Sequence, residues 1–218
     1  MDIKNIIFDY GGVILNINTD LIAVKLHEIG EKDVMALHKK LVEKDIYNKL
    51  ETGEISDREF IEAIRGSMSV PATDQQIIDA WNALILDMPE KRIKMLQEVK
   101  ENYRIFLLSN TNIIHYEHYR AQLENKFGFR SFDKIFEKAY FSHRLGMRKP
   151  GREIFDHVLK DADIEATESL FIDDTFINVE GASIAGMAGF YLRDGIDVTD
   201  VFSEGKLSID LSEVIQQA

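Results

Sequence analysis

Four short motifs in this sequence place reactive side chains at or soon after the end of an apolar segment. They are Asp9-Tyr10-Gly11-Gly12, Ser109-Asn110, Arg148-Lys149-Pro150 and Asp173-Asp174. Together they offer three carboxylates, a hydroxyl and a lysine ammonium group. Such a set could hold a divalent cation beside an anion, provided that the fold brings the four motifs together.

The acidic pair gives the strongest single signal. Asp173 and Asp174 directly follow the apolar run 170–172. Two carboxylates in that position are costly unless a positive group lies between them and a partner. Mg²⁺ binds a few carboxylate oxygens and completes its octahedron with water and phosphate oxygens. We therefore expect Mg²⁺ here, although Asp174 could instead simply cap the following helix.

The other three motifs are weaker when each is taken alone. Asp9 precedes paired glycines, which allow a sharp turn and a close approach to a ligand, but the same pattern also makes a plain turn. Ser109 offers a hydroxyl, and Asn110 a backbone N–H, at the start of a predicted helix. That arrangement suits an anion, or merely a helix cap. Lys149, on its own, would be a solvated loop residue.

The apolar segments before these motifs predict parallel strands. The segments are 3–8, 105–108, 170–172 and 189–192, with a weaker one at 139–141. Most are continuously apolar, which is typical of strands covered on both faces. Helical periodicity separates them, over about 90–101, 113–127, 151–161 and 176–186. This alternation predicts an α/β fold with a doubly wound parallel sheet, whose ligands bind at the carboxyl ends of the strands.

The segment after the first strand breaks this alternation. About 75 residues without a good strand show four helical patterns, near 20–30, 33–48, 57–67 and 74–87. Ser56 with Glu59, and Thr73 with Gln76, fit the capping-box pattern of two helix starts. We expect a four-helix cap at 16–88, lying as a lid over a core domain made of 1–15 and 89–218.

The bulk composition limits the possible partners. The chain has 218 residues, a formal net charge of −12 and no cysteine. The negative charge argues against nucleic acid as a partner, and no apolar run is long enough to cross a membrane. The N-terminus is typical of a buried strand, not of a signal peptide, so we expect a cytoplasmic protein. The sequence leaves the oligomeric state open.

The order and context of the four motifs are similar to those of the haloacid dehalogenase superfamily. More narrowly, the chain resembles the branch with bacterial α-glucose-1-phosphate phosphatases and the phosphatase domain of soluble epoxide hydrolase. The matching segments are Asp9-Tyr10-Gly11-Gly12-Val13, Gly53-Glu54-Ile55-Ser56, Leu108-Ser109-Asn110-Thr111-Asn112, Leu145-Gly146-Met147-Arg148-Lys149-Pro150 and Ile172-Asp173-Asp174. The resemblance implies a Rossmann-like core and a Mg²⁺-dependent phosphomonoester hydrolase. Its substrate would be a small phosphorylated metabolite, with a sugar phosphate favoured by the branch.

The resemblance also implies which residues bind the metal. Asp9 would be the nucleophile, forming an aspartyl-phosphate, and also a ligand of Mg²⁺. The Gly11 carbonyl and Asp174 would be further ligands. Asp173 would be either a ligand or a hydrogen-bond acceptor behind the ligands.

A second group of residues would bind the phosphate. The Ser109 hydroxyl and the Asn110 backbone N–H would hold phosphate oxygens, and Lys149 would stabilise the charge of the transition state. Tyr10 and Gly11 are also expected at the phosphate. Arg148 is a weaker candidate for the same role, and Asn178 is expected to brace Lys149 or the carboxylates.

Gly11 is the one departure from the family pattern. Most phosphatases of the superfamily have a second Asp there, which protonates the leaving oxygen and then activates water, help typically worth about 10²–10⁴-fold. A cap residue such as Glu51, Glu54 or His27 could replace it, or a good leaving group could need less protonation. Slow catalysis by a protein with another main task is the third option.

Two other functions compete with the phosphatase reading. A 2-haloacid dehalogenase would use the same nucleophile without a metal, and the acidic pair at 173–174 argues against it. A binding protein that kept the fold would be expected to lose Asp9, Lys149 or Asp174, and all three are present.

The histidines and the single tryptophan give only weak indications of a functional site. His115, His118 and His143 superficially suggest a transition-metal site, but a solvated helix face is the simpler interpretation. Trp81 could stack on a sugar or lie in the core of the cap.

Overall fold

Five parallel strands form the central sheet of the computed structural model, which describes residues 2–209 and 214–215. The strands are β1 (Asn5–Phe8), β2 (Arg104–Ser109), β3 (Lys138–Phe141), β4 (Ser169–Asp173) and β5 (Ala188–Tyr191). Their order across the sheet is β3-β2-β1-β4-β5, and every neighbouring pair is parallel. The predicted α/β class with a doubly wound parallel sheet is confirmed.

Helices follow the strands along the chain, close to the ranges that periodicity predicted. In the core they are α6 (Glu90–Val99), α7 (Ile113–Phe127), α8 (Ser142–Leu145), α9 (Arg152–Ala162) and α10 (Phe176–Ile184). Short 3₁₀ helices occur at Phe132–Lys134, Ala166–Glu168 and Val198–Val201. A two-stranded hairpin that the sequence did not predict, β6 (Phe202–Ser203) and β7 (Lys206–Leu207), follows the last of them.

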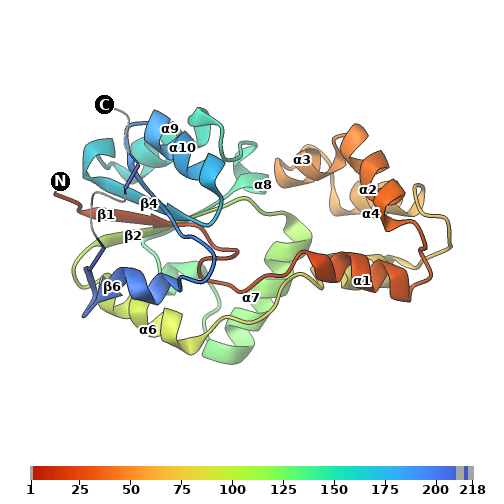
Figure 1. The fold of residues 1–218 in the computed structure, drawn as a ribbon, viewed down its shortest axis with the longest axis horizontal. Helices are drawn as coiled ribbons and strands as arrows, with labels where there is room; N and C mark the ends of the chain where they lie inside the picture. Colours follow the sequence, from red (N-terminus) through yellow and green to blue (C-terminus); the bar gives the residue numbers. More distant parts are fainter. Residues whose placement is uncertain (1, 210–213, 216–218) are drawn as a thin grey trace.

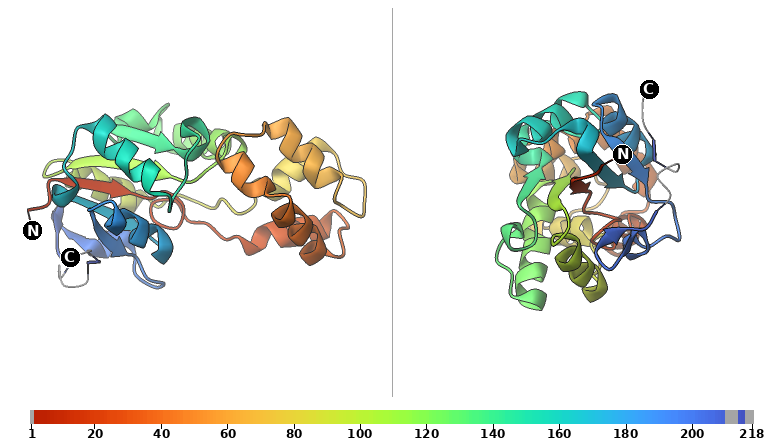
Figure 2. Two further views of the ribbon diagram at one scale, coloured as in Figure 1. Left: turned by 90° about the horizontal axis from the view of Figure 1, so that it is seen from above. Right: turned by 90° about the vertical axis from the view of Figure 1, so that its left-hand side faces the viewer.

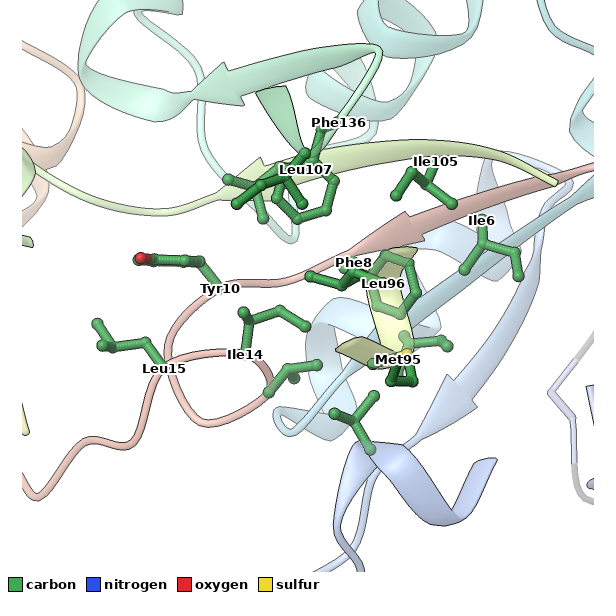
Figure 3. Close-up of a cluster of buried hydrophobic side chains, with 14 of the residues drawn as sticks. Ile6, Phe8, Tyr10, Ile14, Leu15, Met95, Leu96, Ile105, Leu107 and Phe136 are labelled. Carbon is green, nitrogen blue, oxygen red and sulfur yellow. The ribbon is translucent and has the colours of Figure 1, made fainter. Parts of the chain in front are cut away.

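Alternate side chains of β1 enter two separate cores. Ile6 and Phe8 pack in a cluster with α6 and α7, whereas Ile7 packs in a second cluster with α9. Figure 1 shows α9 and α10 on one side of the sheet and α6 and α7 on the other. Figure 3 shows part of the first cluster, in which Phe8 lies among Leu96, Leu107 and Phe136. Coverage of both faces explains why the strand sequences are continuously apolar.

The segment between β1 and α6 is built of helices, as predicted, but it contains five instead of four. They are α1 (Asp20–Glu28), α2 (Val34–Glu43), α3 (Ile46–Glu51), α4 (Asp57–Arg65) and α5 (Asp74–Asn82). The single helix expected at 33–48 ends early because Asp45 has a backbone φ of 56°. That left-handed conformation, which Asp tolerates better than most residues, cannot continue a right-handed helix.

The two predicted helix starts in this segment are confirmed. Ser56 and Glu59 form a complete capping box at α4, and Thr73 and Gln76 form another at α5. Helices α1 to α5 enclose an apolar cluster of their own, whose members include Leu41, Phe60 and Ile77. Figures 1 and 2 show these helices at one end of the molecule, beyond the carboxyl ends of the strands.

Two chain segments connect the five helices to the core and pair with each other. Asn16 N–H donates to Asp87 O at 2.9 Å, and Asn18 N–H donates to Leu84 O at 2.8 Å. Ile17 and Ile85 form an antiparallel bridge between them. The helix predicted at 74–87 therefore ends at Asn82 because the residues after it form this short ribbon.

The C-terminal part of the predicted core domain is described only in part. Residues 210–213 and 216–218 lie outside the described residues, whereas Ile215 pairs with Gly189 of β5. Among the described residues, no helix combines the length and the apolar character that a membrane crossing requires.

Candidate active site

The four sequence motifs meet at the carboxyl edge of the sheet. Asp9 directly follows β1, Ser109 ends β2 and Asp173 ends β4. Because Phe8 is paired in register with residues of both neighbouring strands, these three positions lie side by side. Lys149, from the loop between α8 and α9, completes the group.

The ammonium group of Lys149 lies at the centre of this arrangement. Its Nζ donates to Asp9 Oδ1 at 2.5 Å, to Asp173 Oδ2 at 2.7 Å and to Leu108 O at 2.9 Å. The Lys149 side chain is only 1% exposed. Burial alone would lower the pKa of Lys149, but the charges of Asp173 and Asp9 raise it above its usual value. The site thus contains a buried lysine whose charged form is favoured by two neighbouring carboxylates.

Asp173 is held on both of its carboxylate oxygens. Besides the contact with Lys149, Oδ1 accepts from the Thr175 backbone N–H at 2.7 Å. The Asn178 amide donates to Oδ1 at 3.2 Å and to Oδ2 at 3.1 Å. Asn178 therefore lies against the carboxylates, where the sequence predicted it. Thr175, not Asp174, occupies the N-cap position of α10, so Asp174 is not the helix cap that was the simpler alternative.

Three carboxylates face one another across the first loop. One oxygen each of Asp9, Asp173 and Asp174 lies within 4.8 Å of the others. Burial raises the pKa of Asp9 to about 7, with Lys149 opposing the shift and Asp173 adding to it. Burial, followed by the charge of Asp173, raises the pKa of Asp174 to about 6. Three such carboxylates against one ammonium leave an excess of negative charge that a divalent cation would neutralise.

Gly12 allows the Asp174 carboxylate to lie close to the loop that follows β1. Gly12 has a φ of 81°, and a Cβ atom there would meet Asp174 Oδ2 at 1.9 Å. Position 11 is different: a Cβ on Gly11 would meet only Ile17, at 3.5 Å, which is ordinary van der Waals contact. The structure thus requires glycine at position 12 but leaves room for a side chain at position 11.

Comparisons with known proteins identify the family. Residues 3–186 match the profile of the haloacid dehalogenase-like hydrolases. The chain belongs to this family. A family enzyme from Bacteroides thetaiotaomicron, solved with magnesium and inorganic phosphate, is 34% identical with a TM-score of 0.82. The alignment covers 92% of this chain and 100% of that one.

Relatives of known activity separate the phosphatases of the family from its dehalogenases. A D-ribitol-5-phosphate phosphatase from Bacteroides thetaiotaomicron is 29% identical over 89% of this chain and 94% of its own length. A sesquiterpene phosphatase from Aspergillus oryzae is 26% identical over 88% and 91%. A 2-haloacid dehalogenase from Pseudomonas syringae shares only the fold, at 17% identity and a TM-score of 0.58. This haloacid dehalogenase-like enzyme is accordingly grouped with the phosphatases, and Mg²⁺ is the cofactor that its acidic site fits.

Asn110 has a structural role that the sequence did not reveal. Its amide Nδ2 donates to Lys149 O, and its Oδ1 accepts from Lys149 N–H, both at 2.9 Å. The side chain thus fixes the loop that carries the buried lysine. Sequence reasoning considered only the backbone N–H of Asn110, since the partner lies 39 positions away in the chain.

A cavity of about 490 Å³ begins next to the site, at residues that follow β1 and at the end of β2. Tyr10, Gly11, Ser109 and Asn110 line its end at the sheet, and residues of the two connecting segments, of α1 to α5 and of α7 line most of the rest. The hydroxyl of Tyr10 is buried there without a hydrogen-bond partner. In Figure 3 the Tyr10 oxygen points away from Phe8 and Ile14.

One of the three cap residues named as possible proton donors lines this cavity. Glu51, at the end of α3, accepts from Arg148 Nε at 2.9 Å and so joins the five helices to the loop of Lys149. Glu54 does not line the cavity and instead accepts from the Thr52 hydroxyl. His27 Nδ1 lies 3.1 Å from Glu31 O, within hydrogen-bond distance inside the helical segment.

His115 contradicts the prediction of a solvated helix face. Its Nε2 lies 3.0 Å from Trp81 O and its Nδ1 3.0 Å from the Asn112 amide. Burial lowers the pKa of His115 to about 4. Its ring stacks on Trp81 at 4.9 Å, and Trp81 stacks on Tyr47 at 5.6 Å. The prediction was wrong because α5 covers this face of α7, which no sequence period reveals.

Proposed function

We propose that this chain is a Mg²⁺-dependent phosphomonoester hydrolase that uses Asp9 as its nucleophile. The observation that carries the proposal is the placement of the Lys149 ammonium between Asp9 and Asp173, beside a cluster of three carboxylates. Phosphoryl transfer depends mainly on positioning and on charge stabilisation, and this arrangement supplies both.

The reaction has two displacements at phosphorus. In the first, an oxygen of the Asp9 carboxylate attacks the phosphorus, the ester P–O bond breaks, and the alcohol oxygen leaves and takes up a proton. In the second, water attacks the aspartyl-phosphate, releases inorganic phosphate and restores Asp9. Lys149 stabilises the negative charge in both steps, and the Ser109 hydroxyl and Asn110 N–H orient the phosphate, with Tyr10 and Gly11 beside it.

The metal would be held by Asp9, the Gly11 carbonyl and Asp174. When bound, Mg²⁺ supplies neutralisation of the charge shared by the phosphate and the nucleophile. We assign Asp173 to positioning instead, because both of its oxygens already accept hydrogen bonds from Lys149, Thr175 and Asn178. Of the two roles that the sequence left open for Asp173, we therefore propose the hydrogen-bond acceptor behind the ligands.

Glu51 is our candidate for the proton donor that Gly11 lacks. It is the one residue, of the three considered, that lines the cavity. Its carboxylate pairs with Arg148, which holds it at the edge of the site. The substrate class is a small phosphorylated metabolite, and the relative that acts on D-ribitol 5-phosphate supports the sugar phosphate expected from the branch.

Hydrolysis of p-nitrophenyl phosphate tests the proposal. We expect turnover with Mg²⁺, none with EDTA, and none in an Asp9→Asn variant. Asp156→Asn, which alters an exposed carboxylate on α9, is the matched control and should behave as the parent. Turnover that persists in EDTA or in Asp9→Asn would refute the mechanism. No turnover of this ester or of α-glucose 1-phosphate would favour a binding protein.

A further inference from the structure

The cavity beside the site is lined by Tyr10 and Gly11, which follow Asp9 in the chain, and it is continuous with the apolar interior of the five helices. It begins at Tyr10 and Ser109 and extends between α1, α2 and α5. An ester whose phosphate reaches Asp9 therefore has its organic part in this cavity. Its volume of about 490 Å³ is within the range of small-molecule sites and larger than a short polyol needs.

Aliphatic side chains make up most of the cavity wall. Representative members are Ile17, Ile22, Leu26, Leu41, Ile77 and Leu84. The stacked rings of Tyr47, Trp81 and His115 add a flat aromatic surface. Apolar groups that leave water for such a wall gain free energy in proportion to their buried area.

Polar groups make up the smaller part of the wall, and several of them already have partners. Among the described lining residues, Glu51 is the only charged one, and Arg148 occupies its carboxylate. Both ring nitrogens of His115 have partners, and the Tyr47 hydroxyl lies 3.2 Å from His38 Nδ1. The Tyr10 hydroxyl and Trp81 Nε1 are the buried lining atoms without one.

A sugar would lose hydrogen bonds in this cavity. Each of its hydroxyl groups would leave water, and a buried hydroxyl without a partner costs about 1–3 kcal/mol. An apolar alcohol has only its ester oxygen to satisfy, so its organic part loses no hydrogen bond when it leaves water for this wall.

We propose that the preferred substrate is a phosphate monoester of a long apolar alcohol, not of a sugar. This inference rests on the proposed phosphatase activity and deepens it by naming the organic group. It departs from the sugar phosphate that the family branch suggests, because the wall offers apolar contact where a sugar needs donors and acceptors.

A series of n-alkyl phosphates from ethyl to octyl tests the inference with nearly constant leaving groups. We expect kcat/KM to rise about two- to fourfold with each methylene until the cavity is filled. The kcat/KM for octyl phosphate should exceed that for D-ribitol 5-phosphate, the substrate of a relative. A flat alkyl series with D-ribitol 5-phosphate preferred would overturn the inference while p-nitrophenyl phosphate hydrolysis still upheld the proposed function.

Binding to the Asp9→Asn variant separates the two claims if hydrolysis is absent. Calorimetry with Mg²⁺ should show tighter binding of octyl phosphate than of ethyl phosphate, and weaker binding of D-ribitol 5-phosphate than of octyl phosphate. Equal affinities for the two alkyl esters would overturn the inference without reference to turnover.

A matched pair of variants on α1 places the alkyl chain in the cavity. Ala23 lines the cavity rim, whereas its neighbour Val24 is 49% exposed and does not line it. Ala23→Phe should lower kcat/KM for octyl phosphate by about tenfold or more, through lost burial of several methylenes, and spare ethyl phosphate. Val24→Phe should change neither. Equal loss on both esters in Ala23→Phe would contradict the placement.

Discussion

The Nζ atom of Lys149 donates to Oδ2 of Asp173 at 2.7 Å, with both side chains almost fully buried. This contact distinguishes the two adjacent aspartates: Asp173 faces the lysine, whereas Asp174 lies against the turn at Gly12. The pair that looks symmetric in the sequence therefore differs in its contacts, and we propose that Asp173 positions Lys149 while Asp174 binds the metal.

Asparagine substitutions at the two positions should have different effects on magnesium dependence. Asp174→Asn removes a proposed ligand, so the Mg²⁺ concentration for half-maximal activity should rise by about tenfold or more. Asp173→Asn should instead lower kcat at saturating Mg²⁺, with a smaller change in the half-saturating concentration. Titration of p-nitrophenyl phosphate hydrolysis with Mg²⁺ measures both. The reverse pattern would make Asp173 the ligand.

Removal of the buried lysine should destabilise the protein as well as inactivate it. Lys149→Met leaves Asp9 and Asp173 buried without their cation, a loss of about 3–5 kcal/mol in the free energy of unfolding. Urea denaturation without metal measures the effect. Lys160→Met, on the exposed side of α9, is the control and should lie within about 0.5 kcal/mol of the parent. A similarly small effect for Lys149→Met would show that the three-way contact does not stabilise the fold.

The general-acid role of Glu51 predicts a dependence on the leaving group. Glu51→Gln should lower turnover of alkyl phosphates by up to about 10²-fold. It should lower turnover of p-nitrophenyl phosphate much less, because nitrophenolate leaves without protonation. Glu54→Gln, three residues away and outside the cavity lining, is the matched control. Equal losses on both substrates in Glu51→Gln would eliminate Glu51 as the acid.

His115 should make the protein sensitive to mild acid. Its pKa is about 4 in the folded protein, below its ordinary value of 6.5, so the unfolded chain binds the proton first. The stability linked to this neutral histidine is complete above about pH 6.5 and is lost as the pH falls towards 4, by up to about 3 kcal/mol.

Urea denaturation of the parent and of His115→Gln over this pH range measures that contribution. Because glutamine does not titrate, the variant should lose less stability between pH 6.5 and pH 4 than the parent does. Parallel pH profiles for the two proteins would mean that His115 does not control the acid response.

The core of the site could be predicted because parallel strands end at one edge. Asp9, Ser109 and Asp173 each follow an apolar run. The parallel arrangement of the three strands is therefore enough to bring them together. Contacts between distant loops could not be predicted in this way. Two examples are the hydrogen bonds from the Asn110 side chain to the Lys149 backbone and the ion pair of Glu51 with Arg148. Both depend on side-chain directions that no periodicity encodes.

The helical segment was predicted in outline but not in detail. Capping boxes at Ser56 and Thr73 fixed two helix starts because their hydrogen bonds are local. The break at Asp45 depends on a backbone conformation that many sequences allow, and the burial of His115 depends on packing between α5 and α7. Local signals therefore predicted where elements begin, and tertiary contacts decided what they cover.

The stereochemical course at phosphorus tests the central claim most directly. Hydrolysis of an isotopically chiral phosphate ester through an Asp9 aspartyl-phosphate comprises two in-line displacements, each of which inverts the phosphorus. The account predicts net retention of configuration with Mg²⁺ present. Net inversion would show that water attacks the substrate directly and would contradict the role of Asp9 as nucleophile.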